Sequence, residues 1–268
     1  MPEGDTIQRA ARALREAIGG ATITAAEAHP RTGVTARLLV GRTVREVEGR
    51  AKHLLIWCAG STGEVALHTH LGMTGSWHLY QAGQRWTKPA QHATVRLDTA
   101  DWTAVCFTAP VCELLSVRQV AAHPVLAALG PDFAHPGPDT GETLRRLAAQ
   151  GDRPLLDVLL DQRVFAGVGN VYKSELCFLH GLHPLTPVSA LHDKQRAALI
   201  ADAARLLRRN VESPGAGRIT TRPGEAGPLY VYGRGGKPCR RCGTPIRSAL
   251  LGDPARRTAW CPRCQPRC

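Results

Sequence analysis

The stretch LLDVLLDQRVFAGVGNVY, residues 155–172, predicts two helices joined by a tight turn. Its apolar start fits one helix, and a second amphipathic run begins at Val171. Gly167 and Gly169 allow the backbone to reverse sharply and to approach another chain closely. Asn170 stands at the start of the second helix, where free amide donors favour an anion such as a phosphate. The glycines could equally serve packing alone, and these residues leave both interpretations open.

The pattern around this stretch divides the chain into three regions. Across residues 22–117, short β-prone segments alternate with turn residues, a spacing typical of a β-sandwich or barrel rather than a parallel sheet. Residues 124–211 have a helical pattern, and a Gly/Pro-rich stretch, residues 213–228, follows. The fold class we expect is therefore α+β and multidomain. The expected domains are an N-terminal β-sandwich with a leading helix (1–122), a helical domain (123–227) and a small C-terminal element (228–268).

Individual elements follow from the same pattern. The expected strands are residues 43–47, 53–58, 64–70, 76–80, 93–97, 103–107 and 112–117, and the expected helices are residues 144–149, 154–161, 170–180 and 194–209. A leading helix should open with a capping box formed by Asp5 and Gln8 and end at Gly19-Gly20. Its expected apolar stripe is Ile7, Ala10, Leu14 and Ile18.

The N-terminus carries an unusual chemical pair, Pro2 and Glu3. Removal of Met1, as is usual before proline, would leave Pro2 as a free secondary amine beside a carboxylate. Such an amine can attack an electrophilic carbon and form an iminium, which makes neighbouring C–H bonds acidic. The positive end of a helix dipole would favour the uncharged, nucleophilic amine. The alternative is an ordinary chain start in which Asp5 serves only as a helix cap.

Charge points to a polyanionic partner, most often nucleic acid. The chain has 268 residues, a formal net charge of +12 and a pI near 9.7. Residues 226–268 hold nine Lys or Arg and one acid, Asp253, so the excess is concentrated at the C-terminal end. No apolar run approaches the length of a membrane span, and the N-terminus lacks the apolar core of a signal peptide. We expect a cytoplasmic, nucleoid-associated protein without a membrane partner.

Four of the nine cysteines form two Cys-x-x-Cys pairs at the C-terminal end: Cys239, Cys242, Cys261 and Cys264. Eighteen residues separate the pairs, within the spacing of a four-thiolate zinc site. Turn residues followed by a β-prone segment predict a hairpin between them. Residues 228–268 are therefore expected to form a zinc finger stabilised by one structural zinc ion. A redox or disulfide pair is the alternative. Apolar surroundings predict core positions for Cys58, Cys106, Cys112 and Cys177, whereas Cys268 has no assigned role.

Six motifs occur in order along the whole chain. They are Pro2-Glu3, Gly49-Arg50-Ala51-Lys52-His53-Leu54, His70-Leu71-Gly72-Met73-Thr74-Gly75, His123-Pro124 through Leu129-Gly130-Pro131-Asp132, Ala166-Gly167-Val168-Gly169-Asn170-Val171-Tyr172 and the cysteine pairs. This order resembles the formamidopyrimidine-DNA glycosylase and endonuclease VIII family. Within that family, Gly4-Asp5 after Pro-Glu resembles the endonuclease VIII branch, specifically its actinobacterial members.

The resemblance implies a bifunctional DNA glycosylase and abasic-site lyase of base excision repair, acting as a monomer on damaged double-stranded DNA. Pro2 would attack the anomeric carbon of a nucleotide flipped out of the duplex and form a Schiff base. Glu3 would shuttle protons. Lys52 would bind a phosphate beside the lesion and donate a proton in β-elimination, followed by δ-elimination.

Further DNA contacts follow from the same resemblance. Asn170, in the helix-two-turns-helix motif of the helical domain, and Arg256, in the zinc finger, would each hold a phosphate, and Arg256 would assist δ-elimination. Arg257 is the neighbouring alternative to Arg256. Met73 would fill the space left by the flipped base, although a core position is its alternative, and His70 would also contact DNA.

Substrate choice is less defined. Some family members carry Arg and Phe opposite the orphaned base, where this chain has Phe107-Thr108-Ala109-Pro110-Val111-Cys112-Glu113. Thr220, Thr221 and Arg222 are polar candidates for lesion contacts. The endonuclease VIII branch implies oxidised pyrimidines, and oxidised or ring-opened purines are the alternative with the same mechanism. A non-enzymatic damaged-DNA binding protein is the alternative of another class, but binding alone needs no combination of Pro2, Glu3 and Lys52.

Overall fold

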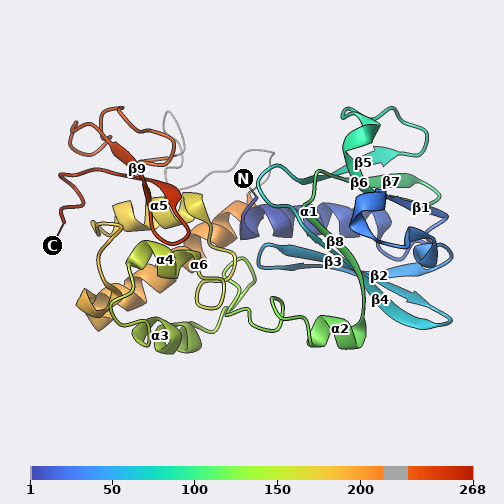
Figure 1. The fold of residues 1–268 in the computed structure, drawn as a ribbon, viewed down its shortest axis with the longest axis horizontal. Helices are drawn as coiled ribbons and strands as arrows, with labels where there is room; N and C mark the ends of the chain where they lie inside the picture. Colours follow the sequence, from blue (N-terminus) through green and yellow to red (C-terminus); the bar gives the residue numbers. More distant parts are fainter. Residues whose placement is uncertain (1, 214–228, 268) are drawn as a thin grey trace. The chain divides into compact units, whose positions relative to one another are not determined.

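The computed structural model describes residues 2–213 and 229–267, and the chain packs into two compact units, Met1–Ala128 and Leu129–Cys268 (Figure 1). The first unit is mainly β and the second mainly helical, with a β-hairpin near its C-terminal end. This confirms the α+β prediction. Among the described residues, no helix combines the length and apolarity that a membrane span requires.

Two antiparallel sheets build the first unit as a sandwich, with strand orders β2-β3-β4-β8 and β1-β6-β7-β5. Figure 1 shows the two sheets above and below the leading helix α1 (Gly4–Ile18), which packs against strands of both. The strands are β1 (Ala25–Ala28), β2 (Thr43–Arg50), β3 (His53–Gly60), β4 (Gly63–His70), β5 (Ser76–Gln81), β6 (Ala93–Asp98), β7 (Trp102–Phe107) and β8 (Val111–Ser116). Short 3-10 helices are η1 (Pro30–Thr32), η2 (Ala36–Leu39) and η3 (Ala90–His92).

The expected strands are all present, most of them within a residue or two of the expected bounds. The strand β1, the helix α2 and the three 3-10 helices were not predicted. β1 has the sequence Ala-Ala-Glu-Ala, without a β-branched or aromatic residue, so its local preference for a strand is weak. Its pairing with β6 stabilises it as a strand. α2 (Val117–Ala121) begins with a capping box between Ser116 and Gln119, a signal that the sequence does contain.

The start of α1 differs from the prediction. The capping box is wrong, because Glu3 occupies the N-cap position and its side chain makes no capping hydrogen bond. Asp5 lies inside the first turn, fully buried, and its Oδ1 accepts the Thr6 backbone N–H at 2.8 Å. The Gln8 side chain turns away from the helix end and donates to the Gly49 carbonyl at 2.8 Å.

α1 is held to the sandwich by its apolar stripe and by that polar contact. Ala11, rather than the expected Ala10, belongs to the buried set with Ile7, Leu14 and Ile18. These side chains share one core with the inner faces of both sheets, where the predicted core residues Cys58, Cys106 and Cys112 also lie.

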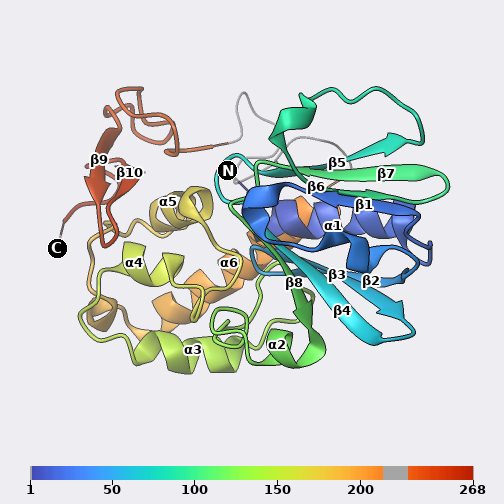
Figure 2. The ribbon, with the colours of Figure 1, turned by 45° about the vertical axis from the view of Figure 1, so that its right-hand side comes forward.

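In the second unit, helices pack around one apolar core that includes Tyr172, Leu176 and Leu207. The expected helices are present as α3 (Thr140–Ala148), α4 (Leu155–Leu160), α5 (Asn170–Leu179) and α6 (Asp193–Glu212), with the short η4 (Val188–Ala190) and the hairpin strands β9 (Arg247–Leu251) and β10 (Arg256–Trp260). Figure 2 shows α4, α5 and α6 in this unit with the hairpin at its end.

The turn between α4 and α5 is braced by one side chain. Gln162 donates from Nε2 to the carbonyls of Leu160 and Val168, both at 2.9 Å, and its Oε1 accepts the Gly167 N–H at 3.0 Å. Gly167 has a φ of 90°, which favours glycine. The turn therefore requires this glycine for its backbone conformation, not only for packing.

A buried carboxylate on α5 ties the C-terminal ribbon to the helices. Glu175 is fully buried and accepts the backbone N–H groups of Tyr230 at 2.8 Å, Val231 at 2.8 Å and Tyr232 at 2.9 Å. Charge-assisted bonds of this kind are stronger than neutral ones. Glu175 therefore fixes the chain segment that leads into the cysteine-rich element.

Replacement of Glu175 with Gln should destabilise the second unit. The amide cannot accept at both of its terminal atoms, so at least one buried N–H loses its partner and the bonds to the others lose the carboxylate charge. We expect the free energy of unfolding to fall by roughly 3 kcal/mol. Urea unfolding of the metal-loaded protein measures this, with the exposed Glu212→Gln as control; equal midpoints for Glu175→Gln and wild type would contradict the assignment.

Candidate active site and nucleic-acid interface

Pro2 and Glu3 lie at the start of α1. The backbone carbonyl of Glu3 accepts the N–H groups of Thr6 at 2.9 Å and Ile7 at 3.1 Å. Glu3 is fully buried and Pro2 is partly buried. Removal of Met1 would give Pro2 a secondary amine beside this buried carboxylate, an arrangement suited to proton transfer during amine chemistry.

Lys52 lies in the two-residue turn between β2 and β3, which is closed by the pair Arg50 and His53. Ala51, the first turn residue, is fully buried and has a φ of 54°, an uncommon conformation for a residue with a side chain. A strained backbone at this turn sets the position from which the half-buried Lys52 projects.

Gly49 brings the Lys52 turn close to the first turns of α1. A Cβ at Gly49 would lie 3.0 Å from Cδ of Gln8, the same side chain that donates to the Gly49 carbonyl. Glycine therefore leaves room for the end of the Gln8 side chain beside β2. Gln8 thus joins α1, which begins next to Pro2 and Glu3, to the strand that leads to the Lys52 turn.

Histidines surround this turn. The His53 and His70 ring centroids are 4.8 Å apart, and Nδ1 of His53 lies 2.9 Å from Nε2 of His68. Burial, followed by the neighbouring His70, His68, His123 and Lys52, lowers the pKa of His53 to about 3. Burial likewise lowers the pKa of His68 and His70. All three rings are therefore mainly neutral at pH 7.

His70 and Met73 lie at the β4 end that leads toward β5. Nδ1 of His70 accepts the Gly72 N–H at 3.3 Å, so the ring proton is on Nε2, where it can be donated to an anion. Met73 is 66% exposed in the following turn, which excludes the core alternative. A large exposed apolar side chain at a turn is suited to insertion between bases.

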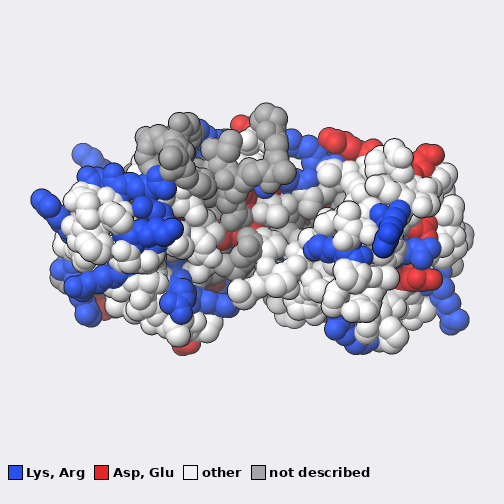
Figure 3. All heavy atoms as spheres, turned by 90° about the horizontal axis from the view of Figure 1, so that it is seen from above, with Lys and Arg blue, Asp and Glu red and all other residues white. Residues whose placement is uncertain are grey.

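In the second unit, α5 and β10 bring Asn170 and the hairpin arginines together. The Asn170 side chain donates from Nδ2 to the Arg257 carbonyl at 3.0 Å, and Lys173, buried on α5, donates to Thr258 Oγ1 at 2.7 Å. Arg256 and Arg257 are exposed. The face drawn in Figure 3 shows basic side chains over much of this unit and few acidic ones, whereas the first unit shows both.

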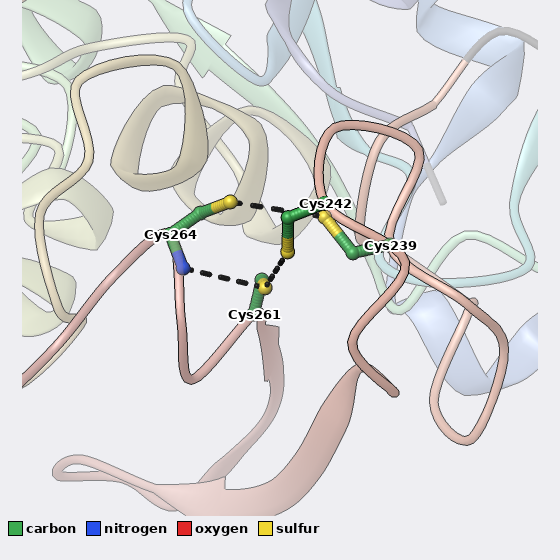
Figure 4. Close-up of side chains that lie close together, drawn as sticks. All are labelled: Cys239, Cys242, Cys261 and Cys264. Carbon is green, nitrogen blue, oxygen red and sulfur yellow. Dashed lines mark hydrogen bonds between the residues drawn. The ribbon is translucent and has the colours of Figure 1, made fainter.

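The four predicted cysteines gather at one point (Figure 4), with their sulfur atoms within 4.8 Å of one another. Cys239 and Cys264 sulfurs are 3.9 Å apart, and those of Cys242 and Cys261 are 3.5 Å apart. Four thiolates about 2.3 Å from a tetrahedral Zn²⁺ would be separated by about 3.8 Å, whereas a disulfide requires about 2.05 Å. The cluster fits a metal ion, and the cysteines are free.

Two features of the site were not predicted. The first is the set of contacts among His53, His68 and Glu113, which depends on strand register. The pattern His-x-His at residues 68–70 was a sign of it in the sequence. The role of Glu175 had no local signal. The expected lesion contacts Thr220, Thr221 and Arg222, and also Cys268, lie outside the described residues.

Pro2 beside the buried Glu3, a turn lysine and a basic unit with a four-cysteine cluster are the features expected of a DNA-processing protein. Residues 1–110 match the formamidopyrimidine-DNA glycosylase N-terminal domain, and residues 129–222 match the formamidopyrimidine-DNA glycosylase H2TH domain. The chain belongs to the formamidopyrimidine-DNA glycosylase and endonuclease VIII family, as its motifs predicted.

Relatives match over their whole length. A probable endonuclease 8 2 of Streptomyces coelicolor is 44% identical, with 99% of this chain and 94% of the relative covered. The DNA-(apurinic or apyrimidinic site) lyase Nei2 of Mycolicibacterium smegmatis is 41% identical, with 99% of each covered. A solved structure of Lactococcus lactis Fpg with abasic-site DNA has a TM-score of 0.83 and 25% identity, covering 99% of this chain and 100% of that one.

The low pKa of His53 predicts loss of stability in acid. The unfolded chain binds this proton near pH 6.5 but the folded protein only near pH 3, so the unfolded state is favoured as pH falls below 6.5. This histidine alone should reduce the unfolding free energy by about 2 kcal/mol between pH 7 and pH 5. Urea unfolding at each pH tests this, and His53→Gln should depend less on pH; identical slopes would disprove the contribution.

Proposed function

We propose that this protein is a bifunctional DNA glycosylase and abasic-site lyase that removes oxidised pyrimidines in base excision repair. The observation that carries the proposal is the placement of Pro2 beside the fully buried Glu3 at the start of α1, in a chain similar over its whole length to endonuclease 8 proteins. Because its substrate is DNA, the protein would act at the nucleoid.

The amine supplies the covalent chemistry. The Pro2 nitrogen attacks C1′ of the flipped nucleotide, the C1′–base bond breaks, and the sugar ring opens as an iminium forms. Glu3 moves the protons needed for ring opening and for the later hydrolysis of the imine. Loss of the C2′ proton then expels the 3′ phosphate, and a second elimination expels the 5′ phosphate, which leaves a one-nucleotide gap.

Other residues hold the DNA. Lys52 binds a phosphate beside the lesion and donates a proton in β-elimination, and His70 offers its Nε2–H to a phosphate. Asn170 and Arg256 hold phosphates from the second unit, Arg256 assisting δ-elimination. The exposed Met73 fills the space of the extruded base.

Purine lesions are the second candidate substrate with the same residues. They are favoured by the likeness to Lactococcus lactis Fpg, which was solved with DNA containing Fapy-dG, although the same protein was also solved with an oxidised pyrimidine in DNA. A formamidopyrimidine-DNA glycosylase of Methylococcus capsulatus is 34% identical to this chain, less than the endonuclease 8 2 relatives. The pyrimidine proposal therefore has the stronger support.

Borohydride trapping tests the imine. With the mature protein and duplexes carrying thymine glycol, an oxidised guanine or an abasic site, we expect covalent capture on thymine glycol that is lost in Pro2→Gly. Capture on the purine lesion alone would favour the second candidate. If none of the three duplexes is captured, and Met1 is shown to be removed, the result would favour a damaged-DNA binding protein.

We propose that the ion held by Cys239, Cys242, Cys261 and Cys264 is zinc, because four thiolates at this separation suit tetrahedral Zn²⁺. The ion would hold the C-terminal ribbon in shape, so that Arg256 and Arg257 stay beside Asn170. The support is the fit of the sulfur atoms and the N–H groups of Arg241 and Cys264, which donate to Cys239 and Cys261 sulfur at 3.4 Å.

Removal of one ligand should remove the metal. We expect one zinc ion per chain by elemental analysis of the wild type and almost none in Cys261→Ser, with binding to duplex DNA weakened about tenfold or more because Arg256 loses its position. Cys268→Ser is the matched cysteine control and should keep its zinc. Full zinc content in Cys261→Ser, or another metal in the wild type, would contradict the assignment.

A further inference from the structure

Lys88, a residue without a role in the site described above, lies at the base of the turn that carries Met73. This turn, residues 71–75, connects β4 to β5. Ser76, the first residue of β5, pairs with Phe107, the last residue of β7. Lys88, in the connection between β5 and β6, contacts both members of this pair: its Nζ donates to Ser76 Oγ at 2.7 Å and lies 5.6 Å from the centroid of the Phe107 ring.

The Met73 turn is itself held in place. Thr108, the residue after β7, donates from Oγ1 to the Thr74 carbonyl at 3.1 Å. Its φ of 50° is an uncommon conformation for a residue with a side chain. Within the turn, the Gly75 N–H donates to the Leu71 carbonyl at 2.8 Å. The base of the turn is therefore a fixed point of the first unit.

The groups that hold the Lys88 ammonium are neutral. An ammonium group only donates, so Ser76 Oγ accepts in this bond, and the same oxygen lies 3.0 Å from Nε2 of His78. Burial, followed by the Lys88 charge, lowers the pKa of His78, so this ring is mainly neutral at pH 7. A hydroxyl oxygen and the face of the Phe107 ring attract a cation without cancelling its charge.

The Lys88 charge has no acidic partner among residues 2–213 and 229–267, which the structure describes. Arg45 on β2 differs, because it forms an ion pair with Glu64. Ser76 uses one of the three ammonium donors, so two remain for an anion. Lys88 is therefore a partly buried cation with a fixed position and an uncompensated charge.

The place of this charge indicates its ligand. Ser76 follows Met73 by three residues, which span at most about 10 Å of extended chain. Duplex DNA carries a phosphate about every 3.4 Å along each strand. When the exposed Met73 fills the place of an extruded base, phosphates of the neighbouring nucleotides come to the base of its turn. An ammonium group binds such a phosphate as a point charge.

We propose that Lys88 binds a phosphate of the DNA backbone beside the Met73 turn, and that Ser76 holds the ammonium there. The contact reads no sequence, and it fixes the duplex relative to the residue that enters it. It is additional to the phosphate contacts assigned to Lys52, His70, Asn170 and Arg256. This inference rests on the proposed function, in which Met73 enters the duplex.

The salt dependence of binding counts the phosphates that a variant still contacts. Fluorescence anisotropy measures the Kd of the full-length, metal-loaded protein for a duplex with a tetrahydrofuran abasic-site analogue over a range of KCl concentrations. Lys88→Gln should weaken binding about tenfold and reduce the slope of log K against log salt concentration by about one. Its melting temperature should stay near wild type, because Lys88 is only partly buried.

Three further variants separate this contact from a general loss of charge. Arg45→Gln is the matched control, since it removes the same charge from the same unit at an ion pair, and its slope should stay near wild type. Lys88→Arg keeps the charge and should keep the slope. Ser76→Ala should weaken binding roughly threefold without changing the slope, because the ammonium remains but loses its acceptor.

A wild-type slope in Lys88→Gln, or an equal loss of slope in Arg45→Gln, would overturn the phosphate contact, and a wild-type Kd in Ser76→Ala would overturn the role of Ser76. Borohydride trapping at Pro2 distinguishes this failure from that of the proposed function. Trapping should persist in Lys88→Gln at protein concentrations above its Kd. Absence of trapping in the wild type would refute the proposed function, whereas a reduced slope in Lys88→Gln would still identify the contact.

Discussion

The contact between Gln8 and Gly49 is the constraint on which the catalytic region depends. A Cβ at Gly49 would lie 3.0 Å from Cδ of Gln8, so glycine leaves room for the end of the Gln8 side chain, whose amide donates to the Gly49 carbonyl. The first turns of α1 carry Pro2 and Glu3, and β2 ends in the hairpin turn of Lys52. The Gln8–Gly49 contact therefore ties the helix that begins next to Pro2 and Glu3 to the strand that leads to Lys52.

A comparable constraint acts in the second unit, where buried polar groups on α5 hold the metal-binding ribbon. Glu175 accepts three backbone N–H groups and Lys173 donates to Thr258, so the helix that begins with Asn170 also fixes the strand that carries Arg256. Buried charges are costly unless they are paired or hydrogen-bonded. Their presence on one helix makes the arrangement specific, because each requires a particular partner on the C-terminal ribbon.

Local sequence pattern predicted most of the strands and helices, the cysteine cluster and the family, since strand alternation, helix periodicity and Cys-x-x-Cys spacing are properties of short segments. It failed where distant residues decide the structure. β1 is a strand because β6 pairs with it, and Gln8 serves Gly49 rather than a helix cap. The residue-level roles at the site rest on the family resemblance, whereas the contacts among His53, His68 and Glu113 require the register of three strands.

The neutral histidines also define the charge at the Lys52 turn. In a chain with a net charge of +12, added imidazolium charge near this lysine would attract a phosphate more strongly but would not fix where the phosphate binds. Burial lowers the pKa of His53, His68 and His70, so in the free protein at pH 7 these rings add hydrogen-bonding groups and little charge. These rings therefore add little positive charge beside Lys52, and in the proposed function a phosphate held there would be positioned by directional hydrogen bonds.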